Sequence, residues 1–183
     1  MINKKHMDLK SITKKLLLLA LVLCATMLNS QAIAADNSAP QIIPADQSCG
    51  VCGMYPARFA KWQSQVIFTD SKMVPFDGCK DMFKYILNMQ AYDKNHTSKD
   101  IASVWVKDFN SGEWLDGKAV SYVIGSSEMG PMGKELIPFG DPTKALAFKK
   151  EKGGMIMDYD DITMDDIKKL GGMKMNGMKK GKM

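Results

Sequence analysis

The chain has 183 residues, of which 45% are hydrophobic and 25% are charged, and its formal net charge is +5. Five of the 25 basic residues and one of the 20 acidic residues lie in the first 34 positions, which leaves 20 basic and 19 acidic residues, a net charge of +1, in the rest. This near-neutral balance lacks the basic excess of nucleic-acid-binding proteins, so we expect no nucleic-acid partner. The part beyond position 34 is long enough for one domain or two small modules.

Residues 1–34 have the three parts of a secretory signal peptide. Five lysines precede an apolar stretch, Leu16–Leu28, that is too short for a comfortable membrane span. The A-x-A pattern that ends at Ala34 predicts cleavage there and export to the periplasm, with an uncleaved anchor as the alternative. Lipid anchoring at Cys24 is disfavoured, because Leu23 before it is not the small residue that a lipoprotein signal needs.

The first half of the exported chain predicts one strand-strand-helix-strand unit. Residues 35–48 are polar and contain prolines, which predicts a flexible lead-in. Hydrophobic periodicity and turn residues then predict strands over 65–69 and 73–76, a helix from about 78 to 90 with Asp77 as its cap, and a strand over 101–109.

The second half repeats this order. We expect a strand over 119–124, a glycine- and methionine-rich loop over 125–133, a strand over 135–139, a helix between Asp141 and Gly153, a strand over 155–159, and a short helix over 164–170 with Thr163 and Asp166 as a capping box. The sequence therefore predicts an α+β fold of two tandem β-β-α-β modules, 49–116 and 117–170, packed as one unit. Residues 171–183 are rich in methionine, lysine and glycine and predict a disordered tail.

The hexapeptide Cys49-Gly50-Val51-Cys52-Gly53-Met54 concentrates two thiols and a thioether in one turn. Donors of this kind suit a soft ion such as Cu(I), or Zn, better than hard ions. Beyond residue 34 the chain has one further cysteine, Cys79, and one histidine, His96, but 13 methionines, because three of its 16 methionines precede that point.

Four interpretations of Cys49 and Cys52 stay open at this point. A thioredoxin-like redox pair needs a helix start beside the thiols, and no helical period begins before residue 78. A zinc knuckle needs further ligands, for which Cys79, His96 or a carboxylate is available. The methionine excess favours Cu(I), and a structural disulfide is compatible with an oxidising compartment.

A second constellation is the loop of residues 125–133, where Met129 and Met132 stand among glycines and a proline. Together with the cysteine hexapeptide it favours thioether ligands for a metal. The sequence contains no Gly-x-Ser-x-Gly motif and no phosphate-binding glycine loop, and a single histidine leaves few routes to a catalytic triad. We therefore expect a protein that is not an enzyme.

The order of four motifs resembles the nitrous oxide reductase accessory proteins, the NosL family. The motifs, which lie within about residues 46–162, are Cys49–Met54, Val74–Asp77, Met129–Phe139, and a helix with Ala145 and Phe148 that ends at Gly153-Gly154. The resemblance implies paired β-β-α-β modules, a topology shared with organomercurial lyase. It also implies an exported Cu(I) metallochaperone that supplies copper for the copper-sulfide centre of nitrous oxide reductase.

The resemblance assigns copper ligation to Cys52 and Met132, with Met129 as a near substitute; Cys49 and Met54 are candidate further ligands. Its implied partners are the nitrous oxide reductase apo-protein as copper acceptor, and a membrane copper exporter or copper-centre assembly proteins. The alternatives are a thiol-disulfide protein, a structural Zn-binding protein and a general periplasmic copper carrier. Cys49, Cys79 and the methionine-rich tail fall outside the minimal family pattern.

Overall fold

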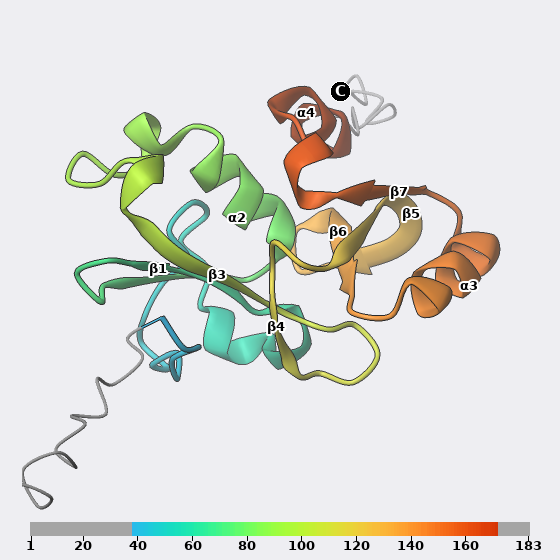
Figure 1. Ribbon diagram of the computed structural model, residues 1–183, viewed down its shortest axis with the longest axis horizontal. Helices are drawn as coiled ribbons and strands as arrows, with labels where there is room; N and C mark the ends of the chain where they lie inside the picture. The colour runs from blue at the N-terminus through green and yellow to red at the C-terminus, as the bar shows by residue number, and fades with distance from the viewer. Residues whose placement is uncertain (1–37, 172–183) are drawn as a thin grey trace, which may run out of the picture. The chain divides into compact units, whose positions relative to one another are not determined.

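The computed structural model describes residues 38–171 (Figure 1). The predicted signal peptide with Cys24, residues 35–37 of the lead-in and residues 172–183 of the tail lie outside the described residues. Within residues 38–171 there are three α-helices and two antiparallel sheets, which confirms the α+β class. No helix in this part of the chain combines the length and apolar character needed to cross a lipid bilayer.

The strand-strand-helix-strand order occurs twice along the chain. The first unit consists of β1 (Ser64–Phe68), β2 (Met73–Phe76), α2 (Cys79–Ile86), β3 (Ile101–Lys107) and an additional short strand β4 (Trp114–Asp116), in the sheet order β2-β1-β3-β4. The second consists of β5 (Ser121–Gly130), β6 (Gly133–Phe139), α3 (Pro142–Lys152) and β7 (Met155–Asp158), in the sheet order β6-β5-β7, followed by α4 (Met164–Gly171).

One hydrophobic core joins the two units. Helix α2 packs against β1 and β2 of the first sheet and against β6 and α4 of the second unit. Its buried Met82 and Phe83 lie in the same cluster as Val104 of the first sheet and as Tyr122 and Leu136 of the second. The other face of the second sheet is covered by α3 through a separate cluster. Burial of this shared apolar surface stabilises both units together.

Helices α3 and α4 begin as their sequences predict. Asp141 accepts a hydrogen bond from the backbone N–H of Thr143 over 2.8 Å, and Gly153 ends α3 with a positive φ of 76°. At α4, the backbone N–H of Thr163 donates to the Asp166 carboxylate (3.2 Å), and the backbone N–H of Asp166 donates to the Thr163 hydroxyl (3.4 Å). These reciprocal bonds confirm the capping box.

Residues 38–48 are an ordered part of the fold, not the flexible lead-in that their composition predicts. The side chain of Ile43 is buried against Ile67 and Met73 on the first sheet. The backbone of Gln41 exchanges two hydrogen bonds with the side-chain amide of Gln65, at 3.0 and 3.1 Å. This segment covers the face of the sheet that α2 leaves open, a tertiary role that local composition does not reveal.

The prediction of a loop over residues 125–133 is also wrong, because most of this segment is part of a β-hairpin. Strand β5 continues to Gly130 and β6 starts at Gly133, so that Pro131 and Met132 form the turn. Met129 pairs with Lys134 and Gly130 with Gly133, after a register shift between Ile124 and Met129. The methionine-bearing segment is therefore held by main-chain pairing.

Helix α2 starts without the predicted cap. Its N-cap is Gly78, and Asp77 makes no capping hydrogen bond. Instead, a carboxylate oxygen of Glu135 on β6 accepts a hydrogen bond from the backbone N–H of Lys80. Gly78 is required for this approach, since a Cβ there would lie 2.8 Å from Cδ of Glu135. A side chain of the second unit thus caps a helix of the first.

Candidate metal centre

The cysteine hexapeptide is a tight loop that rests on β2. The backbone N–H of Cys49 donates to the carbonyl of Met54 over 2.6 Å, and Gly53 supplies the positive φ of 78° that closes the turn. The backbone N–H of Gly50 donates to the carbonyl of Pro75, and a Cβ at Gly50 would lie 2.5 Å from a methyl group of Val74. The glycines therefore allow the close approach that fixes the two cysteines beside the end of β2.

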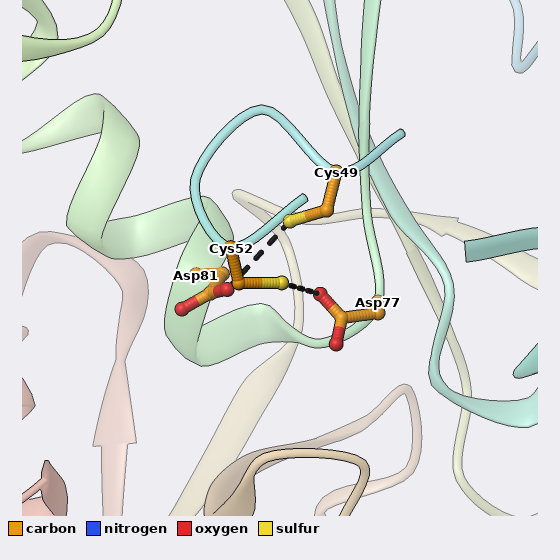
Figure 2. Close-up of side chains that lie close together, drawn as sticks. All are labelled: Cys49, Cys52, Asp77 and Asp81. Atoms are coloured by element: carbon orange, nitrogen blue, oxygen red, sulfur yellow. Dashed lines mark hydrogen bonds between the residues drawn. The ribbon is translucent and has the colours of Figure 1, made fainter. Parts of the chain in front are cut away.

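Four side chains converge next to this loop (Figure 2). One ligand atom from each of Cys49, Cys52, Asp77 and Asp81 lies within 4.8 Å of all the others. Cys52 Sγ donates to Asp77 Oδ1 over 3.1 Å, and Cys49 Sγ donates to Asp81 Oδ2 over 3.6 Å. We call these four residues the Cys–Asp group. The cysteines come from the loop, Asp77 follows directly after β2, and Asp81 lies in the first turn of α2.

Burial makes ionisation of both thiols less favourable than it is for an exposed cysteine. It raises the pKa of the Cys49 thiol to about 11, although the backbone N–H groups of Cys52 and Val51 act in the opposite direction. Burial likewise raises the pKa of the Cys52 thiol far above its ordinary value; the backbone N–H of Met54 lowers it and the Asp77 carboxylate raises it further. A thiol of this kind is a weak nucleophile until a metal or a base removes its proton.

The donor set fits a soft or borderline metal ion. Two thiols suit Cu(I) or Zn, and two carboxylates add ligands that Zn accepts. Oδ2 of Asp77 is buried and makes no hydrogen bond within the described residues. An unpaired buried carboxylate oxygen beside a thiol is costly unless a proton or a cation compensates it. The Cys–Asp group therefore has the chemistry of a cation site.

The two predicted methionine ligands lie at the tip of the β5–β6 hairpin. Their side chains are about half exposed, at 49% for Met129 and 46% for Met132. The hairpin is joined to the first turn of α2, because Lys80 Nζ donates to the carbonyls of Met132 (2.6 Å) and Lys134 (2.9 Å). The structure thus attaches the methionine hairpin to the helix that carries Asp81.

The other sequence candidates occupy different places. Met54 is half-buried and closes the cysteine loop through its carbonyl. Cys79 is a free, buried thiol at the start of α2 and is not a member of the Cys–Asp group. His96 is held between Asp93 (2.8 Å) and Asp70 (3.1 Å), whose hydrogen bonds raise the pKa of its imidazole. The zinc interpretation therefore gains its extra donors from aspartates rather than from Cys79 or His96.

Sequence reasoning missed Asp77 and Asp81 as members of the site. Asp81 lies in the first turn of α2, but Asp77 precedes the extended N-cap Gly78, so no helical spacing in the sequence marks the two carboxylates as neighbours. Asp77 was instead assigned the capping role that its position before a helix favours. Glu135 and Lys80, which connect α2 to the hairpin, lie 55 residues apart and have no local signature.

Two sequence comparisons with known proteins both lead to NosL proteins. A family model described as NosL matches residues 40–167, well over half of the chain. The copper-binding lipoprotein NosL of Stutzerimonas stutzeri is 30% identical over 76 residues, which are 42% of this chain and 40% of that protein. The chain thus matches about two-fifths of the length of that relative.

A solved structure shows the same fold. The crystal structure of the copper chaperone NosL from Shewanella denitrificans superposes with a TM-score of 0.60 at 22% identity, over 70% of this chain and 98% of that one. This likeness concerns the fold, and the family-model match concerns the sequence. The family-model match, which spans well over half of the sequence, shows that the chain belongs to the NosL family.

Proposed function

We propose that this protein is an exported Cu(I) metallochaperone that carries copper in the periplasm for assembly of the copper-sulfide centre of nitrous oxide reductase. The observation that carries the proposal is the Cys–Asp group, in which the two thiols lie within 4.8 Å of each other and each donates to a carboxylate. Membership of the NosL family and the copper-binding names of two similar proteins support the choice of metal.

Binding of the copper cargo would exchange protons for metal. Cu(I) bonds to thiolates, so each thiol that ligates it must lose a proton. Asp77 and Asp81 already accept the hydrogen bonds of the two thiols and are placed to relay these protons to solvent. The thioether of Met132, or of Met129, would complete a site of two or three soft ligands.

Release of the cargo would follow from the same geometry. The cysteines lie on a loop and the methionines on a hairpin tip with half-exposed side chains, so an incoming protein can replace the ligands one at a time. The apo-protein of nitrous oxide reductase is the proposed acceptor, and a membrane copper exporter or copper-centre assembly proteins are proposed partners. A general periplasmic copper carrier would use the same site.

Zinc is the second candidate metal, because two thiols and two carboxylates are a set that tetrahedral Zn accepts. A thiol-disulfide function has less support. The raised pKa values of Cys49 and Cys52 disfavour the thiolate, and the thiolate is the attacking species in disulfide exchange.

The test begins with the metal content of the protein isolated from the periplasm, measured by native mass spectrometry. Competition with a chromogenic Cu(I) chelator then compares the wild type with Cys52→Ser and with Cys79→Ser as a matched control. We expect one bound copper, loss of tight binding in Cys52→Ser and unchanged binding in Cys79→Ser. Unchanged affinity in Cys52→Ser would refute the site, and bound zinc would favour the second candidate.

Transfer to the acceptor is tested separately. Copper-loaded protein is mixed with the apo-protein of nitrous oxide reductase, and copper is quantified in each protein after they are separated. Transfer that exceeds transfer from a copper-chelator complex of equal affinity supports the specific role. Equal rates from both sources favour a general copper carrier.

A further inference from the structure

Two consecutive residues in the first turn of α2 reach different parts of the candidate centre. Asp81 accepts the hydrogen bond of Cys49 over 3.6 Å. Lys80 points to the β5–β6 hairpin, where its Nζ donates to the carbonyls of Met132 (2.6 Å) and Lys134 (2.9 Å). One helical turn therefore contacts both the cysteine pair and the methionine hairpin.

The ammonium group of Lys80 fixes the main chain at the hairpin turn. Pro131 and Met132 form this turn between the paired residues Gly130 and Gly133. Because the Met132 side chain is 46% exposed, packing restrains it little, and its main chain decides where its sulfur can reach. Hydrogen bonds from a charged donor are about twice as strong as neutral ones, so Lys80 is an effective restraint on that main chain.

A second set of contacts holds the same tip. A Cβ added at Gly130 would lie 3.3 Å from Cε3 of Trp62 and 3.2 Å from Cβ of Glu135, so both side chains lie against the tip. Glu135 also accepts a hydrogen bond from the backbone N–H of Lys80. The tip is thus held on a preformed surface, and Lys80 is the residue that binds the Met132 carbonyl directly.

Lys80 is an unexpected residue for a purely structural contact. Its side chain is only 8% exposed, and an ammonium group that leaves water must be compensated by hydrogen bonds. An apolar side chain would fill the same space without this desolvation cost. Besides its electrostatic effect on the buried Glu135, the lysine adds directional hydrogen bonds that join the hairpin turn to the first turn of α2.

We propose that Lys80 is a positioning residue of the copper site, which holds the Met132 thioether in reach of the cysteine pair. The proposal rests on the Cu(I) chaperone function proposed above. Lys80 does not contact the metal in this scheme; it acts through the Met132 main chain. A site prearranged in this way loses less conformational freedom when the metal binds.

A double-mutant cycle tests this coupling. Lys80→Leu removes the ammonium donors, and Lys84→Leu is the control at an exposed position of the same helix. Cu(I) affinity is measured by chelator competition in the wild type and in Met132→Leu. We expect Lys80→Leu to weaken binding about tenfold in the wild type and not further in Met132→Leu, while Lys84→Leu changes nothing. Equal losses in both backgrounds would mean that Lys80 does not act through Met132, which overturns the proposal.

A spectroscopic measurement keeps the proposal testable if Lys80→Leu does not fold. In protein with ¹³C-methyl-labelled methionine, added Cu(I) should shift the methyl signal of Met132 and leave that of Met155, on β7, in place. Lys80→Arg, which keeps charged donors, should retain the Met132 shift and bind copper more tightly than Lys80→Gln. An unshifted Met132 signal in a protein that binds Cu(I) overturns the proposal, whereas a wild type that binds no Cu(I) contradicts the chaperone function itself.

Discussion

Cys52 Sγ donates a hydrogen bond to Oδ1 of Asp77 over 3.1 Å, while Oδ2 of the same carboxylate is buried without a hydrogen bond among the described residues. A negative charge beside a thiol disfavours the thiolate, and Asp77 raises the pKa of Cys52 in addition to the effect of burial. Asp77 therefore accepts the hydrogen bond of the Cys52 thiol, and its charge also disfavours loss of the Cys52 proton before a metal binds. This effect can be tested without any metal.

Asp77→Asn should lower the pKa of the Cys52 thiol in the metal-free protein. The amide keeps an acceptor oxygen but removes the negative charge, so the thiolate becomes less unfavourable. Each unit of decrease in pKa raises the thiolate fraction about tenfold at a pH below the pKa. Alkylation of Cys52 by iodoacetamide, quantified by peptide mass spectrometry at several pH values, should therefore be faster. Asp160→Asn, at an exposed site, is the control; an unchanged rate in Asp77→Asn would argue against this electrostatic role.

Copper binding should release protons and become tighter as the pH rises. The pKa of Cys49 is raised to about 11 and that of Cys52 is raised further, so both thiols are protonated near neutral pH and lose their protons to the metal. Between about pH 6.5 and 8, the logarithm of the Cu(I) association constant should rise by about two per pH unit, after correction for protonation of the competing chelator. Cys49→Ser should reduce this slope to about one. A flat profile in the wild type would show that thiolates are not the ligands.

Glu135 should make the free energy of unfolding depend on pH. Burial raises the pKa of this carboxyl from its ordinary 4.5 to about 8, with a further increase from Asp81 and an opposing effect of the Leu136 N–H and the Lys80 ammonium. Between these two values the unfolded chain has lost a proton that the folded protein keeps. The stabilising contribution is therefore complete below the unfolded pKa and decreases as the pH rises toward 8.

Glu135→Gln isolates this effect, because glutamine keeps the acceptor oxygen for Lys80 but does not titrate. Urea unfolding at about pH 5 and pH 8 should show a smaller loss of stability in the variant than in the wild type. The difference between the two proteins removes the contribution of other groups, such as His96. Parallel stability profiles would indicate that Glu135 titrates near its ordinary value in the folded protein.

Gly78→Ala should destabilise the fold. A Cβ at this position would lie 2.8 Å from Cδ of Glu135, which is only 2% exposed and has little room to move. Crowding of this kind costs about 1–3 kcal/mol. Gly171→Ala is the control, since a Cβ there meets no atom within 4 Å. Thermal unfolding followed by circular dichroism measures both, and equal melting temperatures for the two variants would mean that Glu135 can retract from the helix start.

The sequence predicts the element order because its apolar runs are separated by strong turn and cap signals, such as Asp141 and Gly153. It does not predict the extent of the β5–β6 hairpin, since glycine, proline and glutamate are depleted in strands and the pairing of Met129 with Lys134 depends on the partner strand. The packing of residues 38–48 cannot be predicted from their composition for a similar reason. Ile43 packs on Ile67 and Met73, which belong to strands that follow it in the sequence.

The candidate centre was predicted in part. The spacing of Cys49 and Cys52 predicts a soft-metal loop, because two thiols three residues apart can bind one ion. The carboxylates were missed because Asp77 satisfies a helix-cap pattern equally well, and the choice between the two roles is made by tertiary contacts. In the structure, Glu135 takes the capping position, and Asp77 is free to face Cys52.

The cap that β6 provides for α2 has a consequence for how the two units of the fold can be separated. A fragment that ends at Asp116 would contain both cysteines and both aspartates of the Cys–Asp group, yet it would lack the carboxylate of Glu135 at the start of α2. It would also expose the apolar surface that α2 shares with β6 and α4. The two strand-strand-helix-strand units are therefore not independent halves, because the start of α2, which carries Asp81, is capped by a side chain from a strand of the other unit.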